Sequence, residues 1–102
     1  TGLALFTLDL AGVDDKAGFL GVAARILQFP DYFGSNWDAF EDCLTDLSWL
    51  GAGGYVLVVQ DPGPFSRKAP KDMSMACTIF RDAASYWKKK NIRFFVGLAE
   101  RT

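Results

Sequence analysis

Acidic side chains are the residues of this chain whose type and spacing favour a chemical role. No lysine or arginine occurs between Arg25 and Arg67, whereas six aspartate and glutamate residues do. Residues 26–66 therefore carry a formal charge of −6, and the rest of the chain carries 11 − 6 = +5. A compact acidic patch on a small protein steers the approach of a basic partner and fixes its orientation. The chemistry that this segment offers is electrostatic binding.

The sequence gives less support for a catalytic site or a metal site. The chain has no histidine, which is the commonest acid–base catalyst and metal ligand. Asp38 and Asp42 are spaced to share a Mg²⁺ ion, but no second set of ligands accompanies them. The sequence contains no glycine-rich phosphate loop and no nucleophile–base arrangement. We therefore expect that the protein is not an enzyme and has no catalytic residue, no metal site and no cofactor.

The basic residues and the cysteines indicate which partners and which cellular compartment to expect. The run Lys88–Lys90 favours either a nucleic-acid contact or, more commonly, the offset of a helix dipole, and the −6 segment would repel phosphates. Two cysteines are too few for a disulfide framework. We read no secretion signal and no apolar run of the roughly 20 residues that cross a bilayer. We expect a cytoplasmic protein with reduced thiols and neither a nucleic-acid nor a membrane partner.

The acidic residues fall on one face of a predicted helix that begins at Ser35 or Asn36 and runs to about Ser48. At 100° per residue, its core stripe contains Trp37, Phe40, Leu44 and Leu47. The opposite face carries Asp38, Glu41, Asp42, Thr45 and Asp46. Repulsion between like charges one turn apart suggests a binding role, with a plain solvated face as the alternative. Asp38 also fits a capping box with Ser35, so it serves either the cap or a partner. Asn36 bonds either the loop backbone or a partner.

The elements around this helix indicate an α/β fold. The 102 residues suffice for one domain with one core. Residues 3–8, 55–59 and 92–98 read as strands, the first apolar on both faces, as in a strand covered on two sides. An aspartate at 14 or 15 caps a helix, a loop spans 61 to about 71, and a helix follows to about 90. The core stripe expected for that last helix is Met75, Ile79, Ala83 and Tyr86.

The segment Phe29–Thr45 carries a proline turn, an aromatic pair followed by glycine, and then Asn-x-Asp-Ala and Asp-Cys-Leu-Thr. With these motifs at this spacing it resembles the barstar family of intracellular inhibitors of barnase-type extracellular ribonucleases. A second, shorter likeness is Ile-Phe-Arg-Asp-Ala at residues 79–83. The resemblance implies one barstar-like domain over residues 1–102, with a single layer of three parallel strands and flanking helices.

The resemblance also implies which residues meet the nuclease. The loop and the acidic helix would present carboxylates to the basic residues that hold RNA phosphates, with Asp42 at the centre and Asp82 outlying. Two departures stand beside this interface: Glu41 replaces a tryptophan, and Asp46-Leu47 replaces a glycine–tryptophan pair. The predicted partner-binding residues are Tyr32, Gly34, Asn36, Asp38, Glu41, Asp42, Thr45, Asp46 and Asp82.

The sequence thus predicts an immunity protein that blocks a secreted microbial ribonuclease as a monomer in a 1:1 complex. The alternative keeps the fold and the acidic patch but binds a different basic partner, such as a toxin that is not a ribonuclease. The departures at residues 41, 46 and 47 leave both open.

Overall fold

Three parallel strands form one sheet in the order β1-β2-β3. The computed structural model describes residues 2–31 and 33–100. Along the chain its elements are β1 (Leu3–Asp9), α1 (Lys16–Ile26), α2 (Trp37–Leu44), β2 (Gly54–Gln60), α3 (Gly63–Lys68), α4 (Pro70–Lys89) and β3 (Arg93–Ala99). Both crossovers contain helices, as parallel strands require. The predicted single-layer, three-stranded parallel fold is confirmed.

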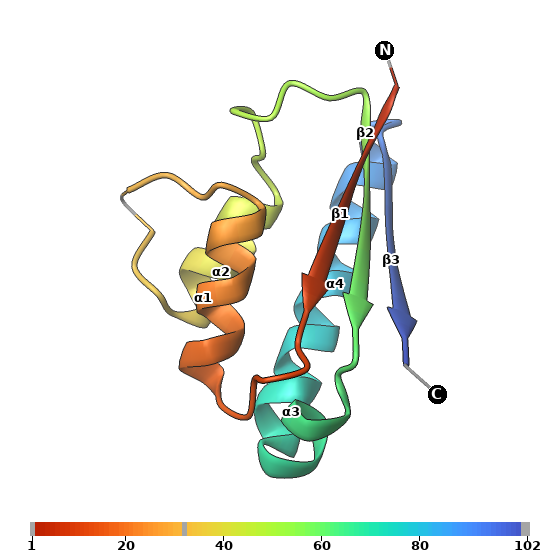
Figure 1. Ribbon diagram of the computed structural model, residues 1–102. Coiled ribbons are helices and arrows are strands. Elements are labelled where there is room, and N and C mark those ends of the chain that lie inside the picture. The colour runs from red at the N-terminus through yellow and green to blue at the C-terminus, as the bar shows by residue number, and fades with distance from the viewer. Residues whose placement is uncertain (1, 32, 101–102) are drawn as a thin grey trace.

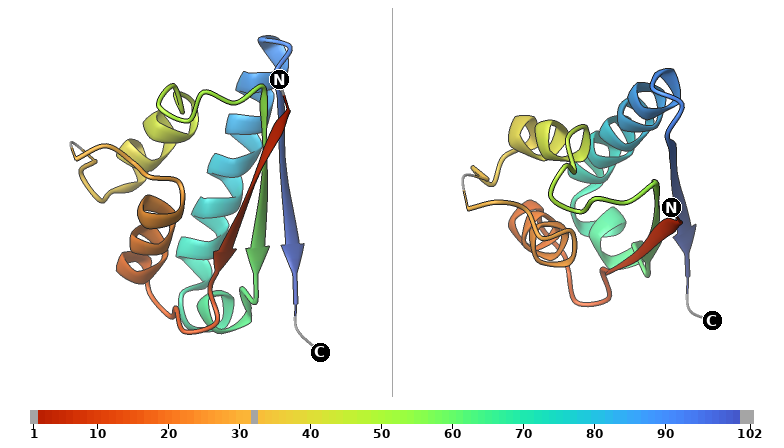
Figure 2. Two further views of the ribbon diagram at one scale, coloured as in Figure 1. Left: turned by 45° about the horizontal axis from the view of Figure 1, so that its top comes forward. Right: turned by 90° about the horizontal axis from the view of Figure 1, so that it is seen from above.

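The helices cover only one face of the sheet (Figures 1 and 2). Leu5, Val56 and Phe95 lie side by side in the register, and Leu5 and Phe95 are 68% and 55% exposed. The prediction that the first strand is covered on two sides is therefore wrong. An apolar run reports the propensity of a strand, and it does not report whether a layer lies over each face.

One aromatic ring joins all four helices on the covered face. Phe19 of α1 is fully buried, and its ring centroid lies 5.2 Å from Phe65 of α3 and 5.4 Å from Phe40 of α2. Phe80 of α4 and Trp37 of α2 complete the cluster at 6.3 and 5.7 Å. These separations are typical of favourable aromatic pairs. The core therefore fixes the helices that carry the acidic residues relative to one another.

Two predictions about the second half of the chain are wrong. The expected loop after residue 61 contains α3, which Pro64 allows because proline is tolerated in the first turn of a helix. The core stripe of α4 is rotated relative to the prediction, because Met75 and Tyr86 are exposed and Trp87 is buried. The buried residues of α4 are Ala76, Ile79, Phe80, Ala83 and Trp87.

Candidate functional site

Asn36 is the N-cap residue of α2. Its backbone is extended, and its side-chain oxygen accepts a hydrogen bond from the Ala39 amide at 2.8 Å. Ser35 has a φ of 53°, so the predicted capping box between Ser35 and Asp38 is wrong, since an N-cap residue needs an extended backbone. Asn36 thus bonds the local backbone, while Asp38 remains in the first turn, where its charge complements the helix dipole.

Gly34 is favoured in this loop by the lack of room for a side chain. Its backbone does not require glycine, because its φ lies outside the left-handed region. A Cβ atom there would lie 3.2 Å from the side-chain nitrogen of Asn36. The next residue, Ser35, is the one with a left-handed backbone, with φ of 53°. Phe33 is half-buried with its ring 4.9 Å from that of Phe29, so it joins the core. Tyr32, a predicted partner-binding residue, lies outside the described residues.

The face assignment of α2 is confirmed. Phe40, Leu44 and Leu47 are fully buried, Trp37 is half-buried, and the side chains of Asp38, Asp42 and Asp46 are exposed. The helix ends at Leu44, earlier than predicted, because Thr45 caps it and Leu47 adopts a left-handed backbone with φ of 51°. Over residues 2–31 and 33–100, the ion pair found is Lys68–Asp14 at 3.9 Å, so none of these three carboxylates is neutralised there.

A hollow between α2 and α4 brings several predicted residues together. Its volume is about 430 Å³, and carboxylates stand on both walls: Glu41 and Asp42 on α2, and Asp82 on α4. The other lining residues are Thr45, Ser85, Tyr86 and Lys89. Lys89 forms no ion pair with a described carboxylate. A cationic side chain entering this hollow would meet acidic groups from two helices, which suits the fork of a guanidinium group.

A buried hydrogen bond joins the two helices that form the hollow. The indole nitrogen of Trp87 in α4 donates to the backbone oxygen of Leu44, the last residue of α2, at 2.8 Å. The last carbonyls of a helix lack partners within the helix, so this buried bond satisfies one of them. Together with the packing of Phe40 against Phe80, it ties α2, the helix of Asp42, to α4, the helix of Asp82.

Thr45 on the acidic face and Cys43 behind it both interact with their own helix or core. The Thr45 hydroxyl donates to the backbone oxygens of Glu41 and Asp42 at 2.9 and 3.3 Å, so its oxygen remains able to accept a bond from a partner. Burial raises the pKa of the Cys43 thiol, and the negative charges of Asp42 and Asp46 raise it further. Cys43 is therefore an inert core thiol rather than a nucleophile.

Among the predicted site residues, the hollow collects Glu41, Asp42, Thr45 and Asp82. Gly34, Asn36, Asp38 and Asp46 lie outside its lining, either in the loop or along α2 and its end. Sequence reasoning missed Ser85, Tyr86 and Lys89. Their spacing of three, four and seven residues after Asp82 places them on the same face of a helix, and this signal was present in the sequence.

Comparison with known proteins decides the family. A family model described as barstar, the barnase inhibitor, matches residues 3–99. The chain belongs to the barstar family. The family consists of inhibitors that bind barnase-like ribonucleases and catalyse nothing, which confirms the expectation that this chain is not an enzyme. No individual curated protein matches the chain. None of the described helices is long and apolar enough to cross a membrane.

Proposed function

We propose that this barstar-family protein acts in the cytoplasm as the immunity protein of a secreted ribonuclease, and that it closes the nuclease active site with the acidic face of α2. The observation that carries the proposal is the hollow in which Glu41, Asp42 and Asp82 meet without a described ion pair. A ribonuclease active site is basic because it binds RNA phosphates. The two surfaces are therefore complementary in charge.

The arrangement also suits tight binding. Asp42 is the central anchor, because α2 holds it over an aromatic core and its carboxylate forms no ion pair with a described cation, including Lys89 of the same hollow. Asp38 and Asp46 extend the negative field along the helix, and Asp82 contributes from the opposite wall. A preorganised acceptor loses little freedom on binding, so more of the charge attraction appears as affinity.

Glu41 stands where the family resemblance places a tryptophan. Because it adds a negative charge there, it favours a partner that carries one more cationic group. Its side chain is half-buried in the lining of the hollow, beside Asp42. A basic toxin that is not a ribonuclease meets the same requirement and remains the second candidate.

The test is a titration of the protein into a panel of secreted microbial ribonucleases, with RNA cleavage as the readout. We expect activity to fall linearly to zero at one inhibitor per enzyme for at least one member, and native mass spectrometry to show a 1:1 complex. Glu41→Ala should weaken the inhibition, because Glu41 lines the hollow, whereas the matched control Glu100→Ala removes one negative charge at an exposed residue after β3, away from the hollow, and should not. Full ribonuclease activity throughout the panel, together with protection against a basic non-ribonuclease toxin, would favour the second candidate.

A further inference from the structure

A second groove runs between α4 and β3, on a different face of α4 from the acidic hollow. One part of it, about 220 Å³ in volume, is lined by Cys77, Phe80, Arg81, Ala84, Val96 and Leu98. A neighbouring part of about 520 Å³ is lined by Ala84, Lys88, Asn91, Ile92, Arg93, Phe94 and Phe95. Ala84 borders both parts, so the two hollows are neighbours along the strand and together form the groove described here.

One wall of this groove is an edge strand. β3 pairs only with β2, so the other edge of β3 offers backbone donors and acceptors that no described strand occupies. Edge strands are commonly shielded by proline, lysine or a bulge. β3 has the sequence Arg-Phe-Phe-Val-Gly-Leu-Ala and pairs in unbroken register, and it contains neither proline nor lysine. It is open to the addition of another strand.

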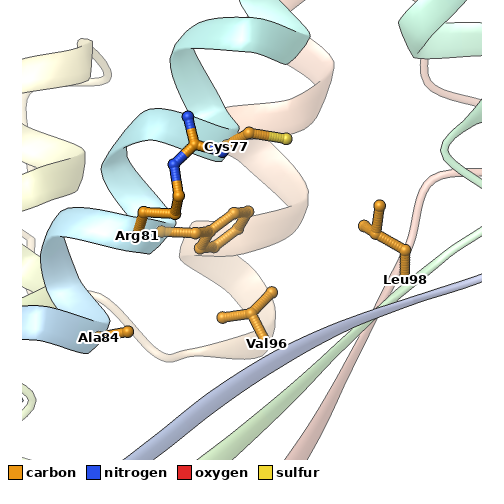
Figure 3. A pocket seen from close by; sticks show the side chains of 6 residues that line it. Cys77, Arg81, Ala84, Val96 and Leu98 are labelled. Carbon is orange, nitrogen blue, oxygen red and sulfur yellow. The ribbon is translucent and has the colours of Figure 1, made fainter.

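The other wall, on α4, is apolar at its base and basic at its rim. Figure 3 shows Val96 and Leu98 rising from β3 towards Cys77, Arg81 and Ala84 of the helix. Leu98 is 60% exposed, which leaves an apolar surface for a side chain that would alternate into the groove. Three cationic residues, Arg81, Lys88 and Arg93, line the groove, and no described lining residue is acidic. None of the three forms an ion pair within the described part of the chain.

We propose that this groove binds an extended acidic peptide segment of a partner protein, which joins the sheet as a strand beside β3. Backbone hydrogen bonds to the free edge would supply affinity, and apolar side chains at every second position would pack against Phe80, Ala84 and Leu98. Acidic side chains of the peptide would pair with Arg81 and Arg93. The site is independent of the ribonuclease-binding surface, because Asp82 and Lys89 lie on a different face of α4.

Charge decides between this occupant and a second copy of the chain. β3 itself, Arg-Phe-Phe-Val-Gly-Leu-Ala, contains no acidic residue, so a second copy paired edge to edge would bring no carboxylate of its strand to Arg81 and Lys88 of the groove. An acidic segment brings carboxylates to these cations, and electrostatic complementarity therefore favours it over a second copy.

The test is a selection from a displayed library of random ten-residue peptides. We expect the wild-type protein to enrich a class in which acidic and apolar residues alternate. The double variant Arg81→Glu/Arg93→Glu should bind the best synthetic peptide at least tenfold more weakly. The matched control Arg25→Glu/Lys71→Glu makes the same charge change at exposed positions on α1 and early in α4, away from the groove, and should bind within about twofold of wild type.

Two readouts locate the bound peptide. Amide hydrogen exchange should slow along β3, and alkylation of Cys77 should slow because its thiol borders the groove. Enrichment of basic peptides alone, equal loss of affinity in both double variants, or tighter binding of a ten-residue oligouridylate than of the acidic peptide would overturn the proposal. So would a stable dimer whose formation protects β3. Ribonuclease inhibition by Arg81→Glu/Arg93→Glu should equal that of wild type, so failure here leaves the proposed function standing.

Discussion

Replacing Asp42 by alanine separates binding from stability. Asp42 is exposed and forms no described ion pair, so its removal breaks no internal contact. The carboxylate lies in the second half of α2, where the helix dipole disfavours a negative charge, and one turn after Asp38. Relief of those two repulsions is worth a few tenths of a kcal/mol. We therefore expect the free energy of unfolding to change by less than about 0.5 kcal/mol, or about 4 °C or less in Tm.

Binding should respond much more strongly. A desolvated carboxylate at the centre of a charged interface is a typical hot spot, and its truncation costs about 2 kcal/mol or more, which is roughly 30-fold in Kd. Complexes of the barstar family are among those that define this threshold, so the figure is inherited from the family. The assay pairs thermal unfolding with inhibition titrations against a ribonuclease that the wild type inhibits. Glu100→Ala, which removes the same charge elsewhere, should leave the Kd within about threefold.

Either of two results would refute this reasoning. If Asp42→Ala inhibits the ribonuclease as tightly as wild type, the acidic face of α2 is not the inhibitory surface. If the variant instead unfolds several kcal/mol more easily, Asp42 carries a structural contact that its exposure conceals, and the loss of inhibition then reports instability.

Three other predictions concern the partner, the tie between the helices and the two thiols. Raising the salt concentration to about 0.5 M should lower the association rate with the ribonuclease at least tenfold and change dissociation far less in stopped-flow measurements, whereas a salt-independent association rate would exclude charge steering. Trp87→Phe leaves the buried backbone oxygen of Leu44 without its donor and should lower stability by about 1–3 kcal/mol in urea unfolding; wild-type unfolding would show that the bond contributes nothing. Iodoacetamide at pH 8 should alkylate the partly exposed Cys77 before the buried Cys43, as followed by mass spectrometry. Faster alkylation of Cys43 than of Cys77 would contradict the burial of Cys43. Because the pKa of Cys43 is raised in the folded state, the contribution of this thiol to the free energy of unfolding should be complete below pH 9 and decline as the pH rises further.

The sequence predicted the parallel sheet and the acidic face because both depend on local patterns. Apolar runs and glycine breaks marked the strands, and the 3.6-residue period separated Phe40 and Leu44 from Asp42 correctly. Side chains one turn apart on a helix share a face whatever covers the other side. The prediction that Asp82 shares an interface with Glu41, Asp42 and Thr45 required the family resemblance, because Asp82 comes from a distant helix; that all four line one hollow was learned from the structure.

The errors came from features that depend on the rest of the fold. Whether the outer face of β1 is covered depends on where both crossovers pass, and Leu5 has the same sequence character in either case. The capping box failed because Ser35 lies in a left-handed turn, which shifts the start of α2 by one residue. The core stripe of α4 was predicted wrongly because Met75 and Tyr86 are apolar enough to resemble core residues. In the fold, Trp87 is buried instead and donates a hydrogen bond to the backbone oxygen of Leu44.

The assembly of the acidic hollow from two crossovers has a consequence for folding. α2 belongs to the connection between β1 and β2, whose register joins Leu3 to Gly54, 54 − 3 = 51 residues apart. α4 belongs to the next connection, where Gly54 pairs with Arg93, 93 − 54 = 39 residues apart. Contacts this distant in sequence form late and slowly, because the loops must close first. Neither loop alone carries both walls of the hollow. A nascent or partly unfolded chain would therefore lack the two-walled hollow that we propose as the nuclease-binding site, and inhibitory capacity would then measure the completely folded population.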